Sequence, residues 1–109
     1  MRNNRIYLFL GLAAKAGKVA AGDESCERAA KSGKAFLIVV SEDASQNTIK
    51  KFRDICAYRG IEARCYGLKS ELGKYTGKGA RSVIAVTDKS FAGRLKEMID
   101  GLGKEHGGV

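Results

Sequence analysis

Hydrophobic residues recur along this chain with helical spacing in some segments and as short continuous runs in others. The first segment predicts a helix, because four apolar residues fall on one helical face at i, i+3, i+4 and i+7. These residues are Ile6, Phe9, Leu10 and Ala13. Asn3 or Asn4 could cap this helix, since a side-chain oxygen there can accept a hydrogen bond from a first-turn N–H group.

The next segment, 18–21, lies between glycines and predicts a brief strand. A helix follows at Asp23, which is the expected N-cap, and Glu24 suits the positive end of the helix dipole. The apolar stripe of this helix consists of Cys26, Ala29 and Ala30. We expect it to end at Ser32-Gly33, since glycine after the last turn is a common C-terminal stop.

Two continuous apolar runs, 35–40 and 82–86, predict strands that other elements cover on both faces. Between them, a polar turn at 41–45 precedes a helix that is expected to end at Gly60. Its buried side consists of Ile49, Phe52, Ile55 and Cys56, and its exposed side carries Lys50, Lys51 and Arg53.

The remaining elements are shorter. We expect a strand at 63–66, one or two helical turns at 68–75 and a basic, glycine-rich loop at 77–81. Asp88 is expected to cap the last helix. The core face of that helix consists of Phe91, Leu95, Met98, Ile99 and Leu102, and residues 103–109 predict a flexible C-terminal tail.

Helices that alternate with buried strands predict one sheet with helices on both faces. The sequence therefore predicts an α/β protein, a three-layer α/β/α sandwich with a small mixed sheet. A chain of 109 residues leaves no room for a second core. We expect one domain, residues 1–102.

Composition narrows the kinds of partner. The net charge of +8 and the isoelectric point near 9.6 predict attraction to polyanions such as nucleic acid. The chain has three cysteines without a CxxC pair and one histidine, His106, which is too few ligands for a typical zinc site. An odd number of widely spaced cysteines does not suit a disulfide framework either, so we expect the reducing environment of the cytoplasm. The N-terminus resembles a signal peptide, but cleavage near Ala21 would remove core-facing residues. No apolar run approaches the roughly 20 residues that span a bilayer.

Enzyme signatures are weak. The residues from Gly73 to Gly79 lack both the spacing and the hydroxyl residue of a P-loop, and no dinucleotide-binding pattern follows the first strand. The carboxylates that could form catalytic pairs are Asp23, Glu24, Glu42 and Asp43, of which the first two already suit a helix start. We expect no catalytic residue, no cofactor and no metal.

The start of the second helix is the first candidate site. Its free N–H groups could bind a phosphate, and Gly22 would let a backbone come close. Glu24 could accept hydrogen bonds from guanine, and Arg28 lies one turn later on the same face. The alternative is a capped helix with an ordinary Glu–Arg pair, which spacing alone favours.

The loop before the last strand is the second candidate. Lys78 and Arg81 could meet an RNA backbone, and the small Gly79 and Ala80 would allow a flat approach to bases. Ser82 completes the segment. The alternative is a solvated turn.

Further lysines could extend these sites into one positive face. They are Lys15, Lys18, Lys31 and Lys34, which surround the second helix in the sequence, and each could instead be merely solvated. Tyrosines and phenylalanines are dispersed along the chain, so no stacking platform is evident. This favours a folded RNA over a single strand.

Together these segments resemble the L7Ae-type ribosomal protein family of kink-turn RNA binders, and most closely its short bacterial members. The resemblance runs from Leu8 to Ile99. Its marks are Ala16-Gly17-Lys18-Val19, Gly22-Asp23-Glu24, Ser32-Gly33-Lys34-Ala35, Val40-Ser41-Glu42-Asp43-Ala44, Glu71-Leu72-Gly73 and Gly77-Lys78 before Val83-Ile84-Ala85-Val86. Their order and spacing, more than any single mark, carry the resemblance.

The resemblance implies an α/β/α sandwich that binds an RNA bend flanked by sheared G·A pairs. It places Gly22, Asp23 and Glu24 in the widened groove and residues 79–82 against protruding nucleotides. This chain departs from the family pattern in having Asp23 where strong binders have Asn and Glu27 where they have a basic residue. Arg28, one residue on, could compensate in part.

The sequence thus predicts a non-catalytic, ribosome- or translation-associated protein that binds a kinked RNA, such as ribosomal RNA, in the cytoplasm. One alternative is a protein-interaction module on the same fold. Another is an RNA-binding accessory to an RNA-modifying enzyme. We expect a monomer, because the helices should leave no long apolar stripe exposed once they cover the sheet.

Overall fold

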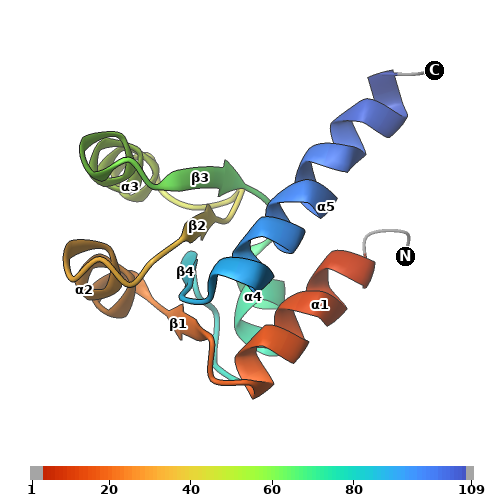
Figure 1. The fold of residues 1–109 in the computed structure, drawn as a ribbon, viewed down its shortest axis with the longest axis horizontal. Helices are drawn as coiled ribbons and strands as arrows, with labels where there is room; N and C mark the ends of the chain where they lie inside the picture. Colours follow the sequence, from red (N-terminus) through yellow and green to blue (C-terminus); the bar gives the residue numbers. More distant parts are fainter. Residues whose placement is uncertain (1–3, 108–109) are drawn as a thin grey trace.

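The computed structural model describes residues 4–107, with the backbone alone for Asn4 and residues 103–107 (Figure 1). The helices are α1 (Asn4–Lys15), α2 (Asp23–Lys31), α3 (Gln46–Arg59), α4 (Lys69–Tyr75) and α5 (Lys89–Gly107). The strands are β1 (Val19–Ala21), β2 (Leu37–Val40), β3 (Glu62–Cys65) and β4 (Val83–Val86). The order of helices and strands agrees with the order predicted from the sequence.

The four strands form one mixed sheet in the order β1-β4-β2-β3. Strand β4 is antiparallel to both of its neighbours, whereas β2 and β3 run parallel. In this register Val83 lies opposite Val40, and Val86 lies opposite both Leu37 and Val19. The last residues of β1 and β2 therefore lie beside the first residues of β4, at the same end of the sheet.

Helices cover both faces of the sheet, as expected (Figure 1). Alternate residues of β2 and β4 point to opposite sides, so each face has its own apolar cluster. One cluster joins the sheet to α2 and α3 through Cys26, Phe52 and Cys56. The other joins it to α1, α4 and α5 through Leu10, Leu72 and Leu95. The predicted three-layer α/β/α sandwich is confirmed.

The central strands β2 and β4 are buried along their whole length, which confirms the expectation from their continuous apolar runs. Strand β2 starts at Leu37, and Phe36 before it is exposed. Helix α3 ends as predicted, because Gly60 adopts the left-handed conformation with φ 69°. Asp88 caps α5 by accepting a hydrogen bond from the backbone N–H of Phe91 (2.9 Å).

The structure revises or leaves open what the sequence predicted at three helix ends. Asp23 is the first residue of α2 and not its cap: Gly22 occupies the cap position with φ 100°, and no side chain accepts a capping bond there. Asn4 is likewise the first residue of α1, and Asn3 lies outside the described residues. The backbone of α5 is helical to Gly107, beyond the expected start of a tail at 103. The flexibility of 103–109 stays a prediction, and 108–109 lie outside the described residues.

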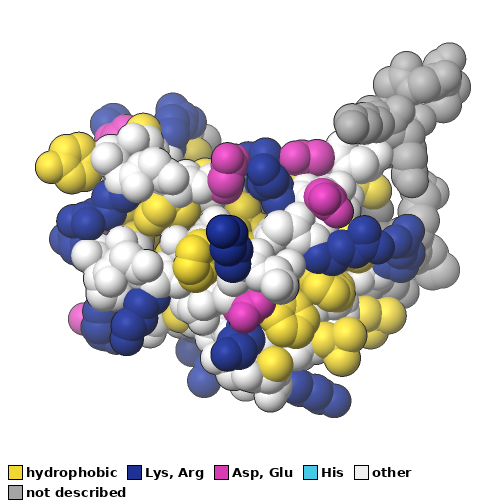
Figure 2. All heavy atoms as spheres, in the orientation of Figure 1, with side chains coloured by type: hydrophobic (Ala, Val, Ile, Leu, Met, Phe, Trp, Pro, Cys, Tyr) yellow, Lys and Arg dark blue, Asp and Glu magenta, His cyan; other side chains and the backbone are white. Residues whose placement is uncertain are grey.

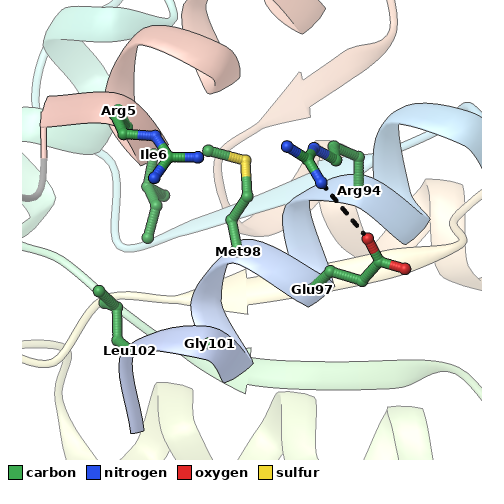
Figure 3. Close-up of a pocket in the computed structure, with 7 residues that line it drawn as sticks. All are labelled: Arg5, Ile6, Arg94, Glu97, Met98, Gly101 and Leu102. Atoms are coloured by element: carbon green, nitrogen blue, oxygen red, sulfur yellow. Dashed lines mark ion pairs between the residues drawn. The ribbon is translucent and has the colours of Figure 1, made fainter. Parts of the chain in front are cut away.

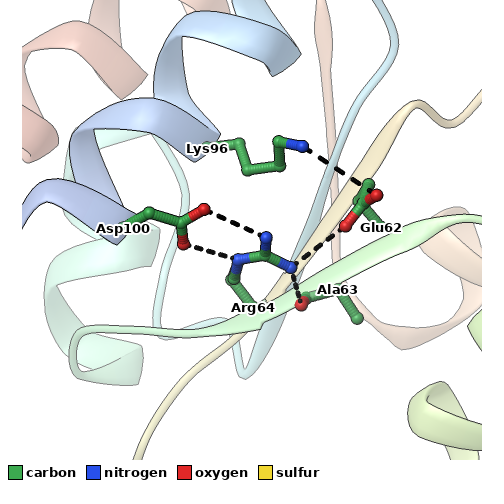
Figure 4. A network of polar contacts seen from close by, with 5 residues as sticks. All are labelled: Glu62, Ala63, Arg64, Lys96 and Asp100. Carbon is green, nitrogen blue, oxygen red and sulfur yellow. Dashed lines mark hydrogen bonds and ion pairs between the residues drawn. The ribbon is translucent and has the colours of Figure 1, made fainter. Parts of the chain in front are cut away.

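The second half of α5 is tied to the edge strand β3 by a charged network (Figure 4). The guanidinium of Arg64 donates to both carboxylate oxygens of Asp100, at 2.7 and 3.1 Å, and to Glu62 at 3.2 Å. Lys96 approaches Glu62 from α5 at 3.9 Å. Hydrogen bonding to Asp100 raises the pKa of Arg64. The two bonds between these side chains connect α5 to the sheet.

Within the described residues, no helix combines the length and the apolar character needed to cross a membrane.

Candidate functional site

The two candidate segments lie side by side because β1 pairs with β4. Strand β1 ends at Ala21, opposite Ile84, so Gly22 follows at the point where β4 begins. The N–H of Gly22 donates to the carbonyl of Val83 at 2.9 Å. The start of α2 and the loop before β4 are thus held together by backbone hydrogen bonding.

Arg81 is the loop residue next to the start of α2. A Cβ placed on Gly22 would lie 3.5 Å from both the Cδ and the Nε atoms of Arg81. The Arg81 guanidinium also donates to the carbonyls of Gly79 (3.3 Å) and Ala80 (3.0 Å), so it folds over its own loop. Position 22 therefore lies within van der Waals reach of Arg81, and its φ of 100° is the feature that favours glycine there.

The loop is anchored on its other side by α4. The N–H of Lys78 donates to the carbonyl of Gly73 (2.8 Å), and the N–H of Arg81 donates to that of Lys69 (3.0 Å). Gly73 is buried beneath the loop, whereas Lys78, Gly79 and Ala80 are exposed. A rigid base therefore presents the basic, small residues of the loop to solvent.

The first turn of α2 is open to solvent beside this loop. Its leading N–H groups have no intrahelical acceptor, and Gly22 brings no side-chain oxygen to cap them. Glu24 and Arg28 are both exposed and share one face of the helix. Among the ion pairs of the described residues, none joins Glu24 to Arg28. The structure therefore does not show the Glu–Arg pair that was the alternative interpretation of this helix start.

A lysine from α3 pairs with two of the three acidic residues of α2. The ammonium of Lys51 contacts the carboxylates of Asp23 and, at 2.8 Å, Glu27. Lys31 contacts Glu27 from the next turn of α2 at 2.7 Å. Hydrogen bonds from Lys31 and Lys51 lower the pKa of Glu27 to about 2, and those to Asp23 and Glu27 raise the pKa of Lys51 to about 12.

The sequence placed Lys51 on the exposed side of its helix but gave no indication that it belongs to this site. Both α2 and α3 pack on the same face of the sheet, and that packing brings residues far apart in the chain into contact. Because Lys51 and Lys31 offset Glu27, the negative charge that departs from the family pattern has a local counter-charge. A shallow hollow of about 500 Å³ along α2 includes both Glu27 and Arg28.

Two of the predicted lysines lie at the other end of the sheet. The carbonyl of Lys18 accepts from the N–H of Thr87 (2.8 Å), and Lys34 follows the C-terminal end of α2. Helix α2 has nine residues, which at 1.5 Å per residue separates its ends by roughly 13 Å. Lys18 and Lys34 therefore do not surround the start of α2, and Lys31 is engaged with Glu27.

Three of the four carboxylates considered for catalysis have structural partners. Asp43 accepts from the N–H of Lys69 (3.0 Å) and Glu42 from that of Gly67 (3.2 Å), so both hold the turn before α4. Asp23 pairs with Lys51. Within the described part of the chain, no group of three or more His, Cys, Asp or Glu residues could hold a metal ion.

Five of the eight aromatic residues, although dispersed along the sequence, form ring contacts in the fold. The ring of Tyr7 stacks on Tyr75, with centroids 5.2 Å apart, and contacts Tyr66 at 5.5 Å. Phe9 similarly meets Phe91 at 5.3 Å. Helix α1 crosses α4 and α5, which brings these rings together. The rings pack against one another, and Tyr66 is buried in the core.

A separate hollow of about 410 Å³ lies between α1 and α5 (Figure 3). Arg5, Arg94 and Glu97 contribute its charged groups, and Arg94 pairs with Glu97 at 3.6 Å. Met98 and Leu102 contribute apolar surface. None of the predicted site residues lines this hollow, so it is distinct from the surface around α2.

Two known proteins are similar to this chain in sequence. The chain is 40% identical over 94 residues to RNA-binding protein YlxQ of Bacillus subtilis (strain 168), covering 86% of this chain and 94% of the relative. It is 37% identical over 95 residues to RNA-binding protein YlxQ of Enterococcus faecium, covering 85% and 89%.

Solved structures share the fold. A protein of unknown function from Bacillus halodurans superimposes with a TM-score of 0.84 at 36% identity, covering 87% of this chain and 96% of that one. The Giardia lamblia 15.5kD RNA binding protein superimposes with a TM-score of 0.73 at 18% identity, covering 87% and 81%. The sequence profile of the ribosomal protein L7Ae/L30e/S12e/Gadd45 family matches residues 4–96. The chain is therefore a member of the ribosomal protein L7Ae/L30e/S12e/Gadd45 family.

Proposed function

We propose that this protein binds structured RNA, without catalysis, through the start of α2 and the adjoining loop at 77–82. The pairing of β1 with β4 carries the proposal, because it makes one surface from two segments that lie far apart in the chain. The net charge of +8 favours a polyanionic partner. The names of the relatives point to the same class of ligand.

Each part of this surface has a distinct role. The first-turn N–H groups of α2 bind a phosphate, and Glu24 accepts hydrogen bonds from the N–H groups of a guanine. Arg28 and Lys78 contact the backbone on either side, and Arg81 covers the junction between them. Gly79, Ala80 and Ser82 have small side chains or none, so unstacked nucleotides can pack directly against the loop.

The salt bridges around Lys51 adapt this surface to an acidic helix start. With Asp23 and Glu27 held by Lys51 and Lys31, their charges are turned to α3 and to the next turn of α2. A phosphate at the first turn then meets less repulsion than the sequence suggests. Lys18, Lys31 and Lys34 serve as contacts only for a longer RNA that runs along α2.

The finer proposal is a kink-turn RNA of the ribosome or translation machinery, bound in the cytoplasm. A rigid surface that combines a helix start with a neighbouring loop suits a bent backbone better than a straight one. Shape is the main feature by which proteins recognise folded RNA. Selectivity for the bend, with no requirement for a cofactor, is therefore the expected behaviour.

A binding titration tests both levels of the proposal. The probes are a standard kink-turn RNA and an unbent duplex of equal length, each at two salt concentrations. Arg28→Ala and Lys78→Ala should each weaken kink-turn binding about three- to tenfold and reduce the salt slope by about one contact. Lys50→Ala is the matched control, because its exposed ammonium pairs with Asp54 on α3.

The outcomes are distinct. Preference for the kink-turn RNA that both site variants weaken and the control retains supports the full proposal. Equal, salt-sensitive binding to both RNAs removes the kink-turn claim and leaves a basic RNA-binding surface. Absence of binding to either RNA refutes the proposed function.

A further inference from the structure

Helix α1 is apolar on two sides. From Ile6 to Ala14 it has no charged residue, although it is a surface helix of the domain. One side, with Ile6 and Leu10, belongs to the core. On the other side Leu8 and Leu12 are each 58% exposed. Leu8 and Leu12 therefore leave a short apolar ridge exposed, whereas a helix that is hydrophobic all round is normally covered on all sides.

The exposed leucines line a groove between α1 and the end of α4. Tyr75, Thr76 and Gly77 contribute its opposite side, and its volume is about 610 Å³. Gly11 lets the two elements meet, because a Cβ there would lie only 3.3 Å from the carbonyl oxygen of Tyr75. In Figure 2, hydrophobic side chains gather over α1 at the lower right of the view.

The charged residues of this groove are all basic. Lys15 and Lys74 are the two charged residues that line it, and no acidic residue is found among its described lining residues. Both side chains are exposed, and the ammonium of Lys74 lies 5.5 Å from the ring centroid of Tyr75. A groove with an apolar centre and basic residues at its border is complementary to a ligand that has apolar side chains next to acidic ones.

We infer that the groove binds an acidic amphipathic helix of a partner protein. Leu8 and Leu12 are one helical turn apart, so they form a short ridge of the kind against which the side chains of a second helix pack. Lys15 and Lys74 then pair with acidic residues beside the apolar anchors of that helix. The occupied groove would leave the start of α2 free and shares Gly77 with the proposed RNA-binding loop, so the inference is tested by peptide binding in the absence of RNA.

Two other occupants fit less well. A second copy of this chain would bring two basic rims together, in molecules that each carry a net charge of +8. An RNA base needs an open aromatic face, and one face of Tyr75 is already stacked on Tyr7. Leucine side chains offer no such stacking surface.

The test uses a synthetic helical peptide with leucines at i, i+3 and i+7 flanked by glutamates, and a counterpart with lysines in place of the glutamates. Amide NMR spectra of the full chain are recorded as each peptide is added. We expect the acidic peptide to shift the resonances of Gly11, Thr76 and Gly77 in a saturable way and the basic peptide to leave them unchanged. Lys74→Gln should weaken acidic-peptide binding about threefold.

The double variant Leu8→Gln/Leu12→Gln should weaken that binding at least tenfold and leave kink-turn RNA affinity unchanged. Both leucines are largely exposed, so the variant is expected to fold, which its circular dichroism and urea unfolding check. Tyr58→Gln is the matched control, because Tyr58 is 85% exposed on α3.

Three results would overturn the inference. The first is equal binding of both peptides, or binding of neither at millimolar concentration. The second is a dimer in sedimentation experiments that the double variant abolishes, which would assign the groove to a second copy. The third is loss of RNA affinity in the double variant, which would assign it to RNA. RNA binding by the unmodified chain is scored separately, so failure here is distinguishable from failure of the proposed function.

Discussion

Gly73→Ala tests whether α4 sets the position of the loop at 77–82. A Cβ at position 73 would lie only 1.9 Å from the carbonyl oxygen of Gly79 and 2.6 Å from its carbonyl carbon. Since Cβ contacts below 3.0 Å essentially never occur, the loop backbone must move by at least about 1.1 Å. That movement also strains the bond from the N–H of Lys78 to the carbonyl of Gly73.

The expected free energies follow from these contacts. Overpacking of this kind lowers the free energy of unfolding by about 1–3 kcal/mol. Gly93→Ala is the matched control, because Gly93 lies in α5 and a Cβ there would meet nothing within 4 Å. Replacing this helical glycine should raise stability by roughly 0.5–1 kcal/mol. The same substitution therefore has opposite signs at the two positions.

Urea unfolding followed by circular dichroism measures this difference, and RNA titration measures its effect on the site. Gly73→Ala should unfold at a lower urea concentration than the unmodified protein and bind kink-turn RNA more weakly. Gly93→Ala should unfold at a higher concentration and bind as before. If Gly73→Ala is as stable as Gly93→Ala and shows unchanged amide resonances for the loop, the reasoning from the close contact is refuted.

Three further predictions concern charge and thiol chemistry. Because the pKa of Glu27 is lowered in the folded state, the Glu27 carboxylate stabilises the fold above pH about 4.5, and this contribution is lost as the pH falls toward about 2. Glu27→Gln or Lys51→Met should therefore flatten the pH dependence of the free energy of unfolding, measured in urea, within that window. A double-mutant cycle of Arg64→Gln and Asp100→Asn should give a coupling energy of about 0.5–1 kcal/mol, because both groups are partly exposed, and a value near zero would contradict the anchoring of α5. In the native state, Cys65 should react with a thiol reagent, but more slowly than a free thiol because burial raises its pKa. The buried Cys26 and Cys56 should react only on unfolding.

The sequence determined the elements of the fold because their signals are local. Continuous apolar runs marked β2 and β4, and glycines marked the ends of α2 and α3. At the start of α2 the error was one residue, because aspartate and glycine are both common at helix starts for different reasons. Asp23 is a good capping residue, but Gly22 before it adopts φ 100°, which suits glycine and leaves Asp23 inside the helix.

The two halves of the candidate site could each be found in the sequence, since a helix start and a basic loop have recognisable compositions. Their adjacency could not be derived from the residues alone. It depends on the antiparallel pairing of β1 with β4, which are separated by more than sixty residues of chain. The family resemblance implied both segments, and the register now gives the contact between Gly22 and Arg81.

Other features depended wholly on packing. The helical period placed Lys51 on an exposed face, but only the packing of α3 beside α2 brings it to Asp23 and Glu27. The same period assigned one apolar face to α1, and only the packing of α1 beside the end of α4 shows that Leu8 and Leu12 stay exposed. Local patterns determine which residues form each helix or strand, whereas contacts across the sheet and between layers depend on the relative placement of whole elements.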